Sequence, residues 1–403
     1  MLSGWRVGSL FGIPLFLDPS WFFILLLVTM INAREFDSSL GSILAWVAGL
    51  AMALLLFSSV LLHELGHSLA ALSQGIKVNS ITLFIFGGIA SIDRESKTPG
   101  EAFQVAIAGP LVSFILFGLF YVLTLTLPTS AWAYTIANEI ARINLVLALF
   151  NLIPGLPLDG GQVLKAAVWK LTGDLFTGVR WAARTGKGFG LIALSLGLGM
   201  TLLTGTLAFI WPTLIGWFIF RNASAYDQLT TLQEVLLKLM ASNAMTRDFR
   251  VVEANQTLRS FADEYILTDR QNPMPYYAAT NGRYRGLVKI EDLHFVERSR
   301  WDTETLETIV RPLSEIPTVQ EKTPLVEVIN SLEELNIKRV SVLSPAETVA
   351  GVIDRGDIVR AVARKLNLAI PPAAIQRIKA EGVYPPGFQL VEIAKTLSSV
   401  TNT

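Results

Sequence analysis

The sequence predicts a polytopic α-helical membrane protein of about six transmembrane helices with a small membrane-embedded β segment, followed by a soluble α+β module. Three observations carry this prediction. Of the 403 residues, 51% are hydrophobic and only 16% are charged, with a mean hydropathy of +0.48, which is too apolar for an ordinary soluble protein. Residues 1–220 hold only 21 of the 66 Asp, Glu, Lys and Arg residues. The charge-rich remainder contains an internal repeat.

Five apolar runs are long enough to cross a hydrocarbon core of roughly 30 Å. The last one is too long for a single crossing, and its Leu203-Thr204-Gly205-Thr206 stretch suggests two helices joined by a turn, which gives six crossings. The first is interpreted as a retained span and not as a signal peptide, because Arg6 is the only early positive charge. The runs lie at residues 14–32, 42–73, 101–127, 133–153 and 188–221.

The distribution of lysine and arginine predicts the orientation. With six crossings, nearly all of these residues in the membrane half fall on one side, while Arg34 lies on the other. The positive-inside rule then places both termini and the soluble half in the cytoplasm, most simply at the cell (inner) membrane. The residues on the positive side are Arg6, Lys77, Arg94, Lys97, Lys165, Lys170, Arg180, Arg184, Lys187 and Arg221.

Residues 79–92, between the second and third runs, are β-branched and aromatic with a Gly87-Gly88 break, which predicts one or two strands. Strands at membrane depth are tolerated only when they are buried in protein or line a wet cavity. We therefore expect this segment beside a cavity.

Composition also excludes several functions. The net charge is zero and no basic block occurs, so nothing favours a nucleic-acid partner. Cysteine is absent, which removes disulfides, thiolate metal sites and cysteine nucleophiles. Any metal ion must therefore be held by histidine and carboxylate.

The strongest chemical signal is His63-Glu64-Leu65-Gly66-His67, near the end of the second run. Residues four apart share one face of a helix, so both imidazoles can bind one zinc ion while Glu64 stands beside it as a general base. Burying these groups at membrane depth costs at least several kcal/mol without compensation. That cost favours a metal site over a polar cluster between helices.

Asp159 is the candidate third ligand. It follows the fourth run in Asn151-Leu152-Ile153-Pro154-Gly155-Leu156-Pro157-Leu158-Asp159-Gly160-Gly161, where the prolines interrupt the helix and Gly160-Gly161 lets the backbone turn tightly. The alternative is that Asp159 only caps a helix beginning near Gln162. Three ligands would leave a fourth zinc position for water, the pattern of a catalytic site. Asn151 could stabilise an oxyanion, or it could bond the backbone at a helix end.

These two motifs, together with Phe86-Gly87-Gly88-Ile89-Ala90 and Ala108-Gly109-Pro110, resemble the site-2 protease family of intramembrane zinc metalloproteases over residues 1–221. The resemblance implies zinc on His63, His67 and Asp159, Glu64 as base, and Asn151 as an oxyanion or substrate-positioning residue. It implies cleavage of a transmembrane protein substrate within the lipid bilayer. An unwound substrate would pair with the strand at Phe86, Gly87, Gly88 and Ile89.

The soluble half repeats itself, because VEANQTL at 252–258 matches VQEKTPL at 319–325, and Gly286…Asp292 matches Gly351…Asp357. Each copy is predicted as strand, helix, strand and short helix. The repeat resembles a pair of CBS domains, regulatory modules that bind adenine nucleotides and that could form a homodimer. Asp292 and Asp357 match the ribose-binding position, but Lys289 and Asp354 replace the usual Thr or Ser, which weakens the case for a nucleotide.

The predicted organisation is a protease domain at 1–221, a linker helix at 222–242, CBS repeats at 243–302 and 303–368, and an unassigned tail at 369–403. The alternative function is a CBS-regulated membrane metal or ion transporter, which would not need Glu64 between two histidines. Serine and diaspartyl proteases are disfavoured because Gly-x-Ser-Gly is absent and Asp159 lacks an obvious acidic mate. His294 is expected to be an ordinary surface histidine.

Overall fold

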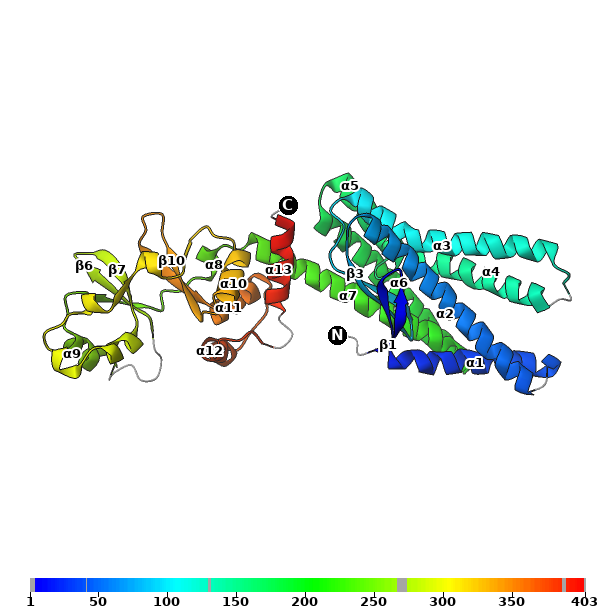
Figure 1. The fold of residues 1–403 in the computed structure, drawn as a ribbon, viewed down its shortest axis with the longest axis horizontal. Coiled ribbons are helices and arrows are strands. Elements are labelled where there is room, and N and C mark those ends of the chain that lie inside the picture. The colour runs from blue at the N-terminus through cyan, green and yellow to red at the C-terminus, as the bar shows by residue number, and fades with distance from the viewer. Residues whose placement is uncertain (1–3, 41, 130–131, 267–273, 386–388, 402–403) are drawn as a thin grey trace. The chain divides into compact units, whose positions relative to one another are not determined.

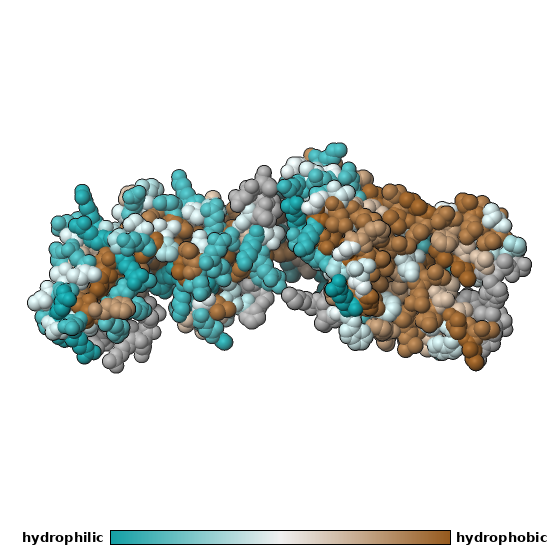
Figure 2. Space-filling view, viewed as in Figure 1, coloured by the Kyte–Doolittle hydropathy of each residue, from teal (hydrophilic) through white to brown (hydrophobic). Residues whose placement is uncertain are grey.

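The computed structural model describes residues 4–40, 42–129, 132–266, 274–385 and 389–401. The chain folds as two compact units, Met1–Thr230 and Thr231–Thr403. The first is largely helical and apolar, whereas the second carries two small sheets with helices (Figures 1 and 2).

Helices form most of the first unit. Among the described residues, α2, α3, α4 and α6 are long and apolar enough to cross a membrane, and Pro19–Arg34 of α1 is a shorter apolar stretch. Large apolar side chains such as Leu119 stay exposed on these helices, as expected for surfaces that face lipid. The bounds are α1 Pro19–Leu40, α2 Ser42–Ser73, α3 Pro99–Thr126, α4 Trp132–Asn151, α5 Asp159–Thr172, α6 Leu175–Thr204 and α7 Ile210–Lys238.

The predicted break in the last apolar run is confirmed, because α6 ends at Gly205, which adopts a left-handed conformation with φ 66°. The helix that contains the start of this run begins earlier than the run itself. Asp174 caps α6 by accepting hydrogen bonds from the backbone of Phe176 and Thr177, so the helix begins at Leu175. Helix α7 then continues without a break through most of the predicted linker helix.

Four strands form one mixed sheet in the order β1-β2-β3-β4, with β2 and β3 parallel and the other pairs antiparallel. The strand prediction for 79–92 is confirmed as the pair β3 and β4. The β1–β2 hairpin, which turns at Phe11-Gly12 with positive φ, was not predicted, and the first helix therefore begins at Pro19 and not at 14. The strands are β1 Trp5–Leu10, β2 Ile13–Leu17, β3 Val78–Phe84 and β4 Gly87–Ile92.

The second unit contains the two repeats, and both have more strands than predicted. The first repeat forms the sheet β5-β6-β7-β8, and the second forms β11-β10-β9. Strands β6 and β7 pair antiparallel, as do β10 and β11, and a helical segment follows each pair. The bounds are β5 Arg250–Glu253, α9 Leu258–Phe261, β6 Tyr276–Thr280, β7 Arg283–Val288 and β8 Val310–Pro312, then β9 Thr318–Gln320, α10 Leu325–Glu334, β10 Arg339–Leu343, β11 Val349–Asp354 and α11 Arg355–Lys365, with α8 Ala241–Ala244 before them.

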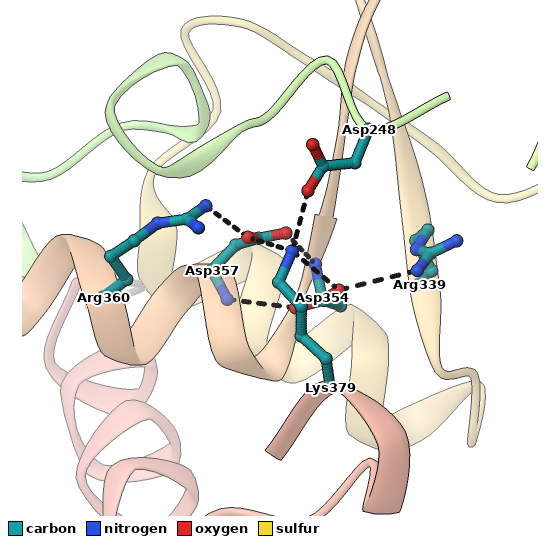
Figure 3. Close-up of polar contacts among 6 residues, drawn as sticks. All are labelled: Asp248, Arg339, Asp354, Asp357, Arg360 and Lys379. Carbon is teal, nitrogen blue, oxygen red and sulfur yellow. Dashed lines mark hydrogen bonds and ion pairs between the residues drawn. The ribbon is translucent and has the colours of Figure 1, made fainter. Parts of the chain in front are cut away.

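The unassigned tail forms two helices that pack on the second repeat, α12 Pro372–Glu381 on α11 and α13 Leu390–Thr401 on α10. Lys379 of α12 inserts its ammonium among three carboxylates (Figure 3), at 2.7 Å from Asp357, 3.0 Å from Asp248 and 3.5 Å from Asp354. Burial raises the pKa of Asp357, whose side chain is fully enclosed. The tail is thus part of the second repeat.

Candidate active site

His63 and His67 lie four residues apart near the end of α2, and both are buried. Their Nε2 atoms stand 3.3 Å apart, as the helical spacing predicts. Each ring is held from behind through Nδ1, since His67 Nδ1 lies 2.7 Å from the Val105 carbonyl and His63 Nδ1 lies 2.9 Å from the Ser113 hydroxyl. Both Nε2 atoms therefore face the same point.

Asp159 reaches the two histidines from the first position of α5. Its Oδ2 lies 2.9 Å from His63 Nε2 and 3.2 Å from His67 Nε2. The alternative that Asp159 only caps the helix is wrong, because Leu158 occupies the N-cap and no side-chain cap is formed. The carboxylate is directed into the helix bundle, as the loop sequence suggested.

The role expected for Gly160 and Gly161 needs correction. Both lie inside α5 and neither has positive φ, so they do not form a tight turn. Instead they allow close backbone packing, because a Cβ on Gly160 would stand 2.2 Å from the Leu152 carbonyl oxygen, and one on Gly161 would stand 2.3 Å from the Gly155 carbonyl carbon. This close approach lets α5 start against the loop that follows α4.

The geometry of these donors suits a tetrahedral zinc ion. Ligands about 2.0–2.1 Å from zinc lie about 3.3 Å from one another, and the three ligand atoms here are 2.9, 3.2 and 3.3 Å apart. The Val105 carbonyl can only accept, so neutral His67 keeps its proton on Nδ1 and directs a bare Nε2 at an Asp159 oxygen. Two acceptors at this distance repel each other unless a cation lies between them.

Glu64 and Asn151 complete the site. Both line a cavity of about 220 Å³ together with His63 and the segment from Ile85 to Gly88. Asn151, the last residue of α4, has its Nδ2 3.4 Å from His63 Nε2, so its side chain faces the site. Glu64 lies within hydrogen-bonding reach of the Ala90 backbone of β4.

Strand β4 passes directly against Glu64, because a Cβ on Gly88 would stand 2.5 Å from Glu64 Cγ. Phe86 lines the same cavity and stacks on Phe218 of α7 with ring centroids 4.6 Å apart. Ile89 is 44% exposed and does not line it. The prediction that residues 79–92 lie beside a cavity is therefore confirmed for its central part.

Sequence reasoning missed the residues that other helices bring to this site. Helix α3 supplies Val105 and Ser113 to the two imidazoles, and a Cβ on Gly109 would stand 2.2 Å from His67 Nε2. Helix α7 contributes Trp211 and Phe218 to the cavity. The resemblance marked Ala108-Gly109-Pro110, but nothing in the sequence showed which atom the glycine approaches.

Residues 51–142 and 130–193 match peptidase family M50. A candidate zinc metalloprotease of Synechocystis sp. is 39% identical over 357 residues, which are 88% of this chain and 94% of that protein. A zinc metalloprotease of Methanocaldococcus jannaschii is 30% identical over 358 residues, 89% of this chain and 95% of that protein. The chain belongs to peptidase family M50.

A solved site-2 protease from Methanocaldococcus jannaschii is 30% identical to this M50 peptidase, with a TM-score of 0.41, and the match covers 56% of this chain and 95% of that one. Residues 307–364 match the CBS domain family. The chain is a membrane-embedded metalloprotease with a CBS region, because it belongs to family M50, matches zinc metalloproteases over most of its length and has helices apolar enough to cross a membrane. This confirms the predicted fold class and enzyme class. The transporter alternative is dropped.

The two acids that match the ribose position in this M50 chain are both paired within the chain. Asp292 binds Arg311 through two hydrogen bonds of 2.8 Å. Asp357 binds Lys379 and Arg360. Asp354 caps α11 by accepting from the Asp357 backbone N–H at 3.0 Å.

Proposed function

We propose that this chain is a zinc-dependent intramembrane endopeptidase in which His63, His67 and Asp159 hold the metal. The observation that carries the proposal is the convergence of two imidazole nitrogens and one carboxylate oxygen at the spacing of a tetrahedral zinc. When bound, zinc supplies Lewis-acid chemistry that makes water nucleophilic near neutral pH. All three groups lie in the membrane half, so the bonds cut are those of membrane proteins.

Glu64 and Asn151 have separate tasks in this proposal. Glu64 takes a proton from the attacking water and passes it to the leaving amine, as a general base and then a general acid. Asn151 donates from Nδ2 to the carbonyl oxygen on which negative charge develops. Its placement 3.4 Å from His63 Nε2 supports this role, because the amide then stands beside the ligand nitrogen.

The substrate is an unwound segment of a transmembrane protein that lies along β4. This strand ends the sheet order, and within the described sheet it pairs only with β3. An extended segment could hydrogen-bond to its outer edge at Gly87 and Gly88, with Phe86 and Ile89 as side-chain contacts. The closeness of Gly88 to Glu64 supports this arrangement, because it brings the strand against the proposed base.

The second unit is proposed to regulate access to this site from the cytoplasm, with both termini on that side of the cell membrane as the lysine and arginine distribution predicts. A cavity of about 380 Å³ in this unit is lined by Arg247, Arg360 and Arg364 as well as Asp248 and Asp357. Three guanidinium groups suit the phosphates of an adenine nucleotide. The pairing of Asp357 with Lys379 weighs against a ribose contact.

Homodimerisation through the CBS repeats stays a prediction. A partner subunit could contact the helices of the second repeat, but the tail already packs on them. Helix α12 packs on α11, and α13 packs on α10. Asn330 of α10 donates to the Ser398 hydroxyl of α13 at 2.6 Å. A partner would therefore have to use another face of the repeat pair.

The test compares wild type with Glu64→Gln on tagged single-span substrates, with bound zinc measured in each purified protein. We expect Glu64→Gln to retain zinc and to lose about 10²–10⁴-fold in cleavage rate, the usual contribution of a general acid–base group. Glu95→Gln is the control, because this glutamate is 63% exposed at its side chain and pairs with Lys165 away from the metal ligands. Equal cleavage by Glu64→Gln, or a wild type without zinc, would refute the proposal.

A further inference from the structure

Helix α3 contacts both histidines of the proposed zinc site, on the side of each ring away from the metal position. Val105, Gly109 and Ser113 follow one another at intervals of four residues and so share one face of the helix. Val105 and Ser113 contact the Nδ1 atoms of His67 and His63, and the absence of a side chain on Gly109 lets α3 approach His67 Nε2. This face of α3 therefore sets the orientation of both rings.

The two contacts differ in chemistry. A carbonyl only accepts, so Val105 fixes the proton of His67 on Nδ1. A hydroxyl both donates and accepts, so Ser113 is compatible with two tautomers of His63 at the same 2.9 Å distance. If Ser113 donates, the proton of His63 lies on Nε2 and that nitrogen cannot bind metal. If Ser113 accepts, Nε2 is bare and directed at the metal position.

Burial makes the Ser113 hydroxyl important for the position of the proton on His63. Ser113 is fully buried and His63 is 2% exposed, so no water competes for the Nδ1 hydrogen bond. In the described part of the chain, the recorded partner of the Ser113 side chain is His63 alone. Without the hydroxyl, an Nδ1–H would have no recorded acceptor, so the tautomer that leaves Nε2 bare for the metal would be destabilised.

We propose that Ser113 is a positioning residue that stabilises the metal-binding tautomer of His63 by accepting a hydrogen bond from Nδ1–H when zinc occupies Nε2. The inference rests on the proposed function, since it concerns one of the proposed zinc ligands. Hydrogen-bond partners of metal ligands typically contribute about 10–100-fold to metal affinity. Ser113 acts only through His63 and does not touch substrate.

The test measures zinc affinity of the full-length protein by competition with a chelator, for wild type, Ser113→Ala, Ser113→Thr and Thr124→Ala. We expect Ser113→Ala to bind zinc about 10–100-fold more weakly, and Ser113→Thr, which keeps the hydroxyl, to stay close to wild type. Thr124→Ala is the matched control, because Thr124 is also buried on α3 but its hydroxyl donates to the Tyr121 carbonyl. It should bind zinc as wild type does.

A second readout reports the tautomer directly. The chain has only three histidines, so ¹⁵N labelling of histidine gives few ring signals. Zinc binding should move the His63 proton from Nε2, where Asp159 Oδ2 accepts it in the metal-free protein, to Nδ1, where Ser113 accepts it. Unchanged zinc affinity in Ser113→Ala, or a zinc-loaded wild type without a proton on His63 Nδ1, would overturn the inference and leave the proposed function intact. A wild type that binds no zinc would overturn both.

If Ser113→Ala does not fold, Ser113→Thr decides. Wild-type zinc affinity with Nδ1 protonated supports the inference, because the hydroxyl is the group that the two side chains share. Weakened affinity contradicts it, because the hydroxyl would then be present while zinc binding fails.

Discussion

Each half of the chain has a cluster of buried charged or ligating groups, but the negative charge of the two clusters is neutralised in different ways. In the soluble half, Asp248, Asp354 and Asp357 converge on the ammonium of Lys379 (Figure 3). In the membrane half, the recorded partners of the Asp159 carboxylate are the two histidines, and the Nε2 of neutral His67 is itself an acceptor. The soluble cluster contains its own cation, whereas the membrane cluster needs one from outside.

This difference separates a structural cluster from a functional one. Uncompensated charge is expensive in both places. A lysine from a later helix neutralises the acids of the second repeat and thereby fixes α12, which gives the cluster a role in folding. The three proposed ligand atoms of the membrane half are arranged at zinc spacing, and His63 lines a cavity together with Glu64, which suits catalysis.

The largest effect expected to sharpen this comparison comes from Gly109→Ala. A methyl group there would stand 2.2 Å from His67 Nε2, so the imidazole must move from the metal position or α3 must separate from α2. We expect zinc content and cleavage to fall to background, measured on the purified protein with metal analysis and a tagged substrate.

The control is Gly118→Ala on the same helix, where an added Cβ meets no atom within 4 Å. Alanine is the better helix former, so this variant should keep zinc and cleavage. If Gly109→Ala bound zinc as tightly as Gly118→Ala does, the close approach of α3 would have no bearing on the metal site.

A smaller effect is expected from Lys379→Met, which removes the cation of the soluble cluster. Burial alone would lower the pKa of Lys379, but hydrogen bonds to Asp357 and Asp248 raise it above its usual value, so the lysine is charged at neutral pH. Breaking a buried pair typically costs about 3–5 kcal/mol, and we expect roughly 2–4 kcal/mol here because Arg360 still pairs with Asp357. Hydrogen exchange of α11 and α12 in the full chain would measure this loss of stability.

Arg377→Met is the matched variant for that measurement. Arg377 lies two residues away on α12, and its side chain is 77% exposed with Glu381 as its partner. Exposed pairs contribute little to stability, so exchange should not change. Zinc content should stay at wild-type level in both variants, and loss of zinc in Lys379→Met would contradict the independence of the two clusters.

The smallest effect is expected from Asp248→Asn, because the Asp248 side chain is 52% exposed. We expect a loss of at most about 1 kcal/mol. The hydrogen bond from Lys379 lowers the pKa of Asp248 below 3.8, so its contribution is present above pH 3.8 and disappears as the pH falls through the folded-state pKa. Unfolding curves of the two proteins should therefore converge in acid, and a difference that grows with acid would contradict this sign.

The sequence predicts the membrane site better than the soluble one for a physical reason. The HExxH spacing is local, since helix geometry alone brings His63 and His67 to one face, and prolines on both sides of Gly155 mark where the chain turns back to present Asp159. The partners at Val105 and Ser113 come from another helix, and no local pattern shows which of its faces meets α2.

The tail also shows that local sequence patterns do not reveal contacts between distant segments. Pro372 at the first turn and Gly382, left-handed at φ 67°, are ordinary helix start and stop signals for α12. That Lys379 would meet Asp248, Asp354 and Asp357 depends on packing between segments that lie far apart along the chain. Only the folded chain shows that contact.

The most direct test of the central claim is the zinc content of full-length wild type, Asp159→Ala and Asp357→Asn after dialysis against metal-free buffer. The account predicts one zinc ion per chain in wild type and in Asp357→Asn, and none in Asp159→Ala. Zinc retained by Asp159→Ala, or lost from Asp357→Asn, would show that the metal is not held by His63, His67 and Asp159.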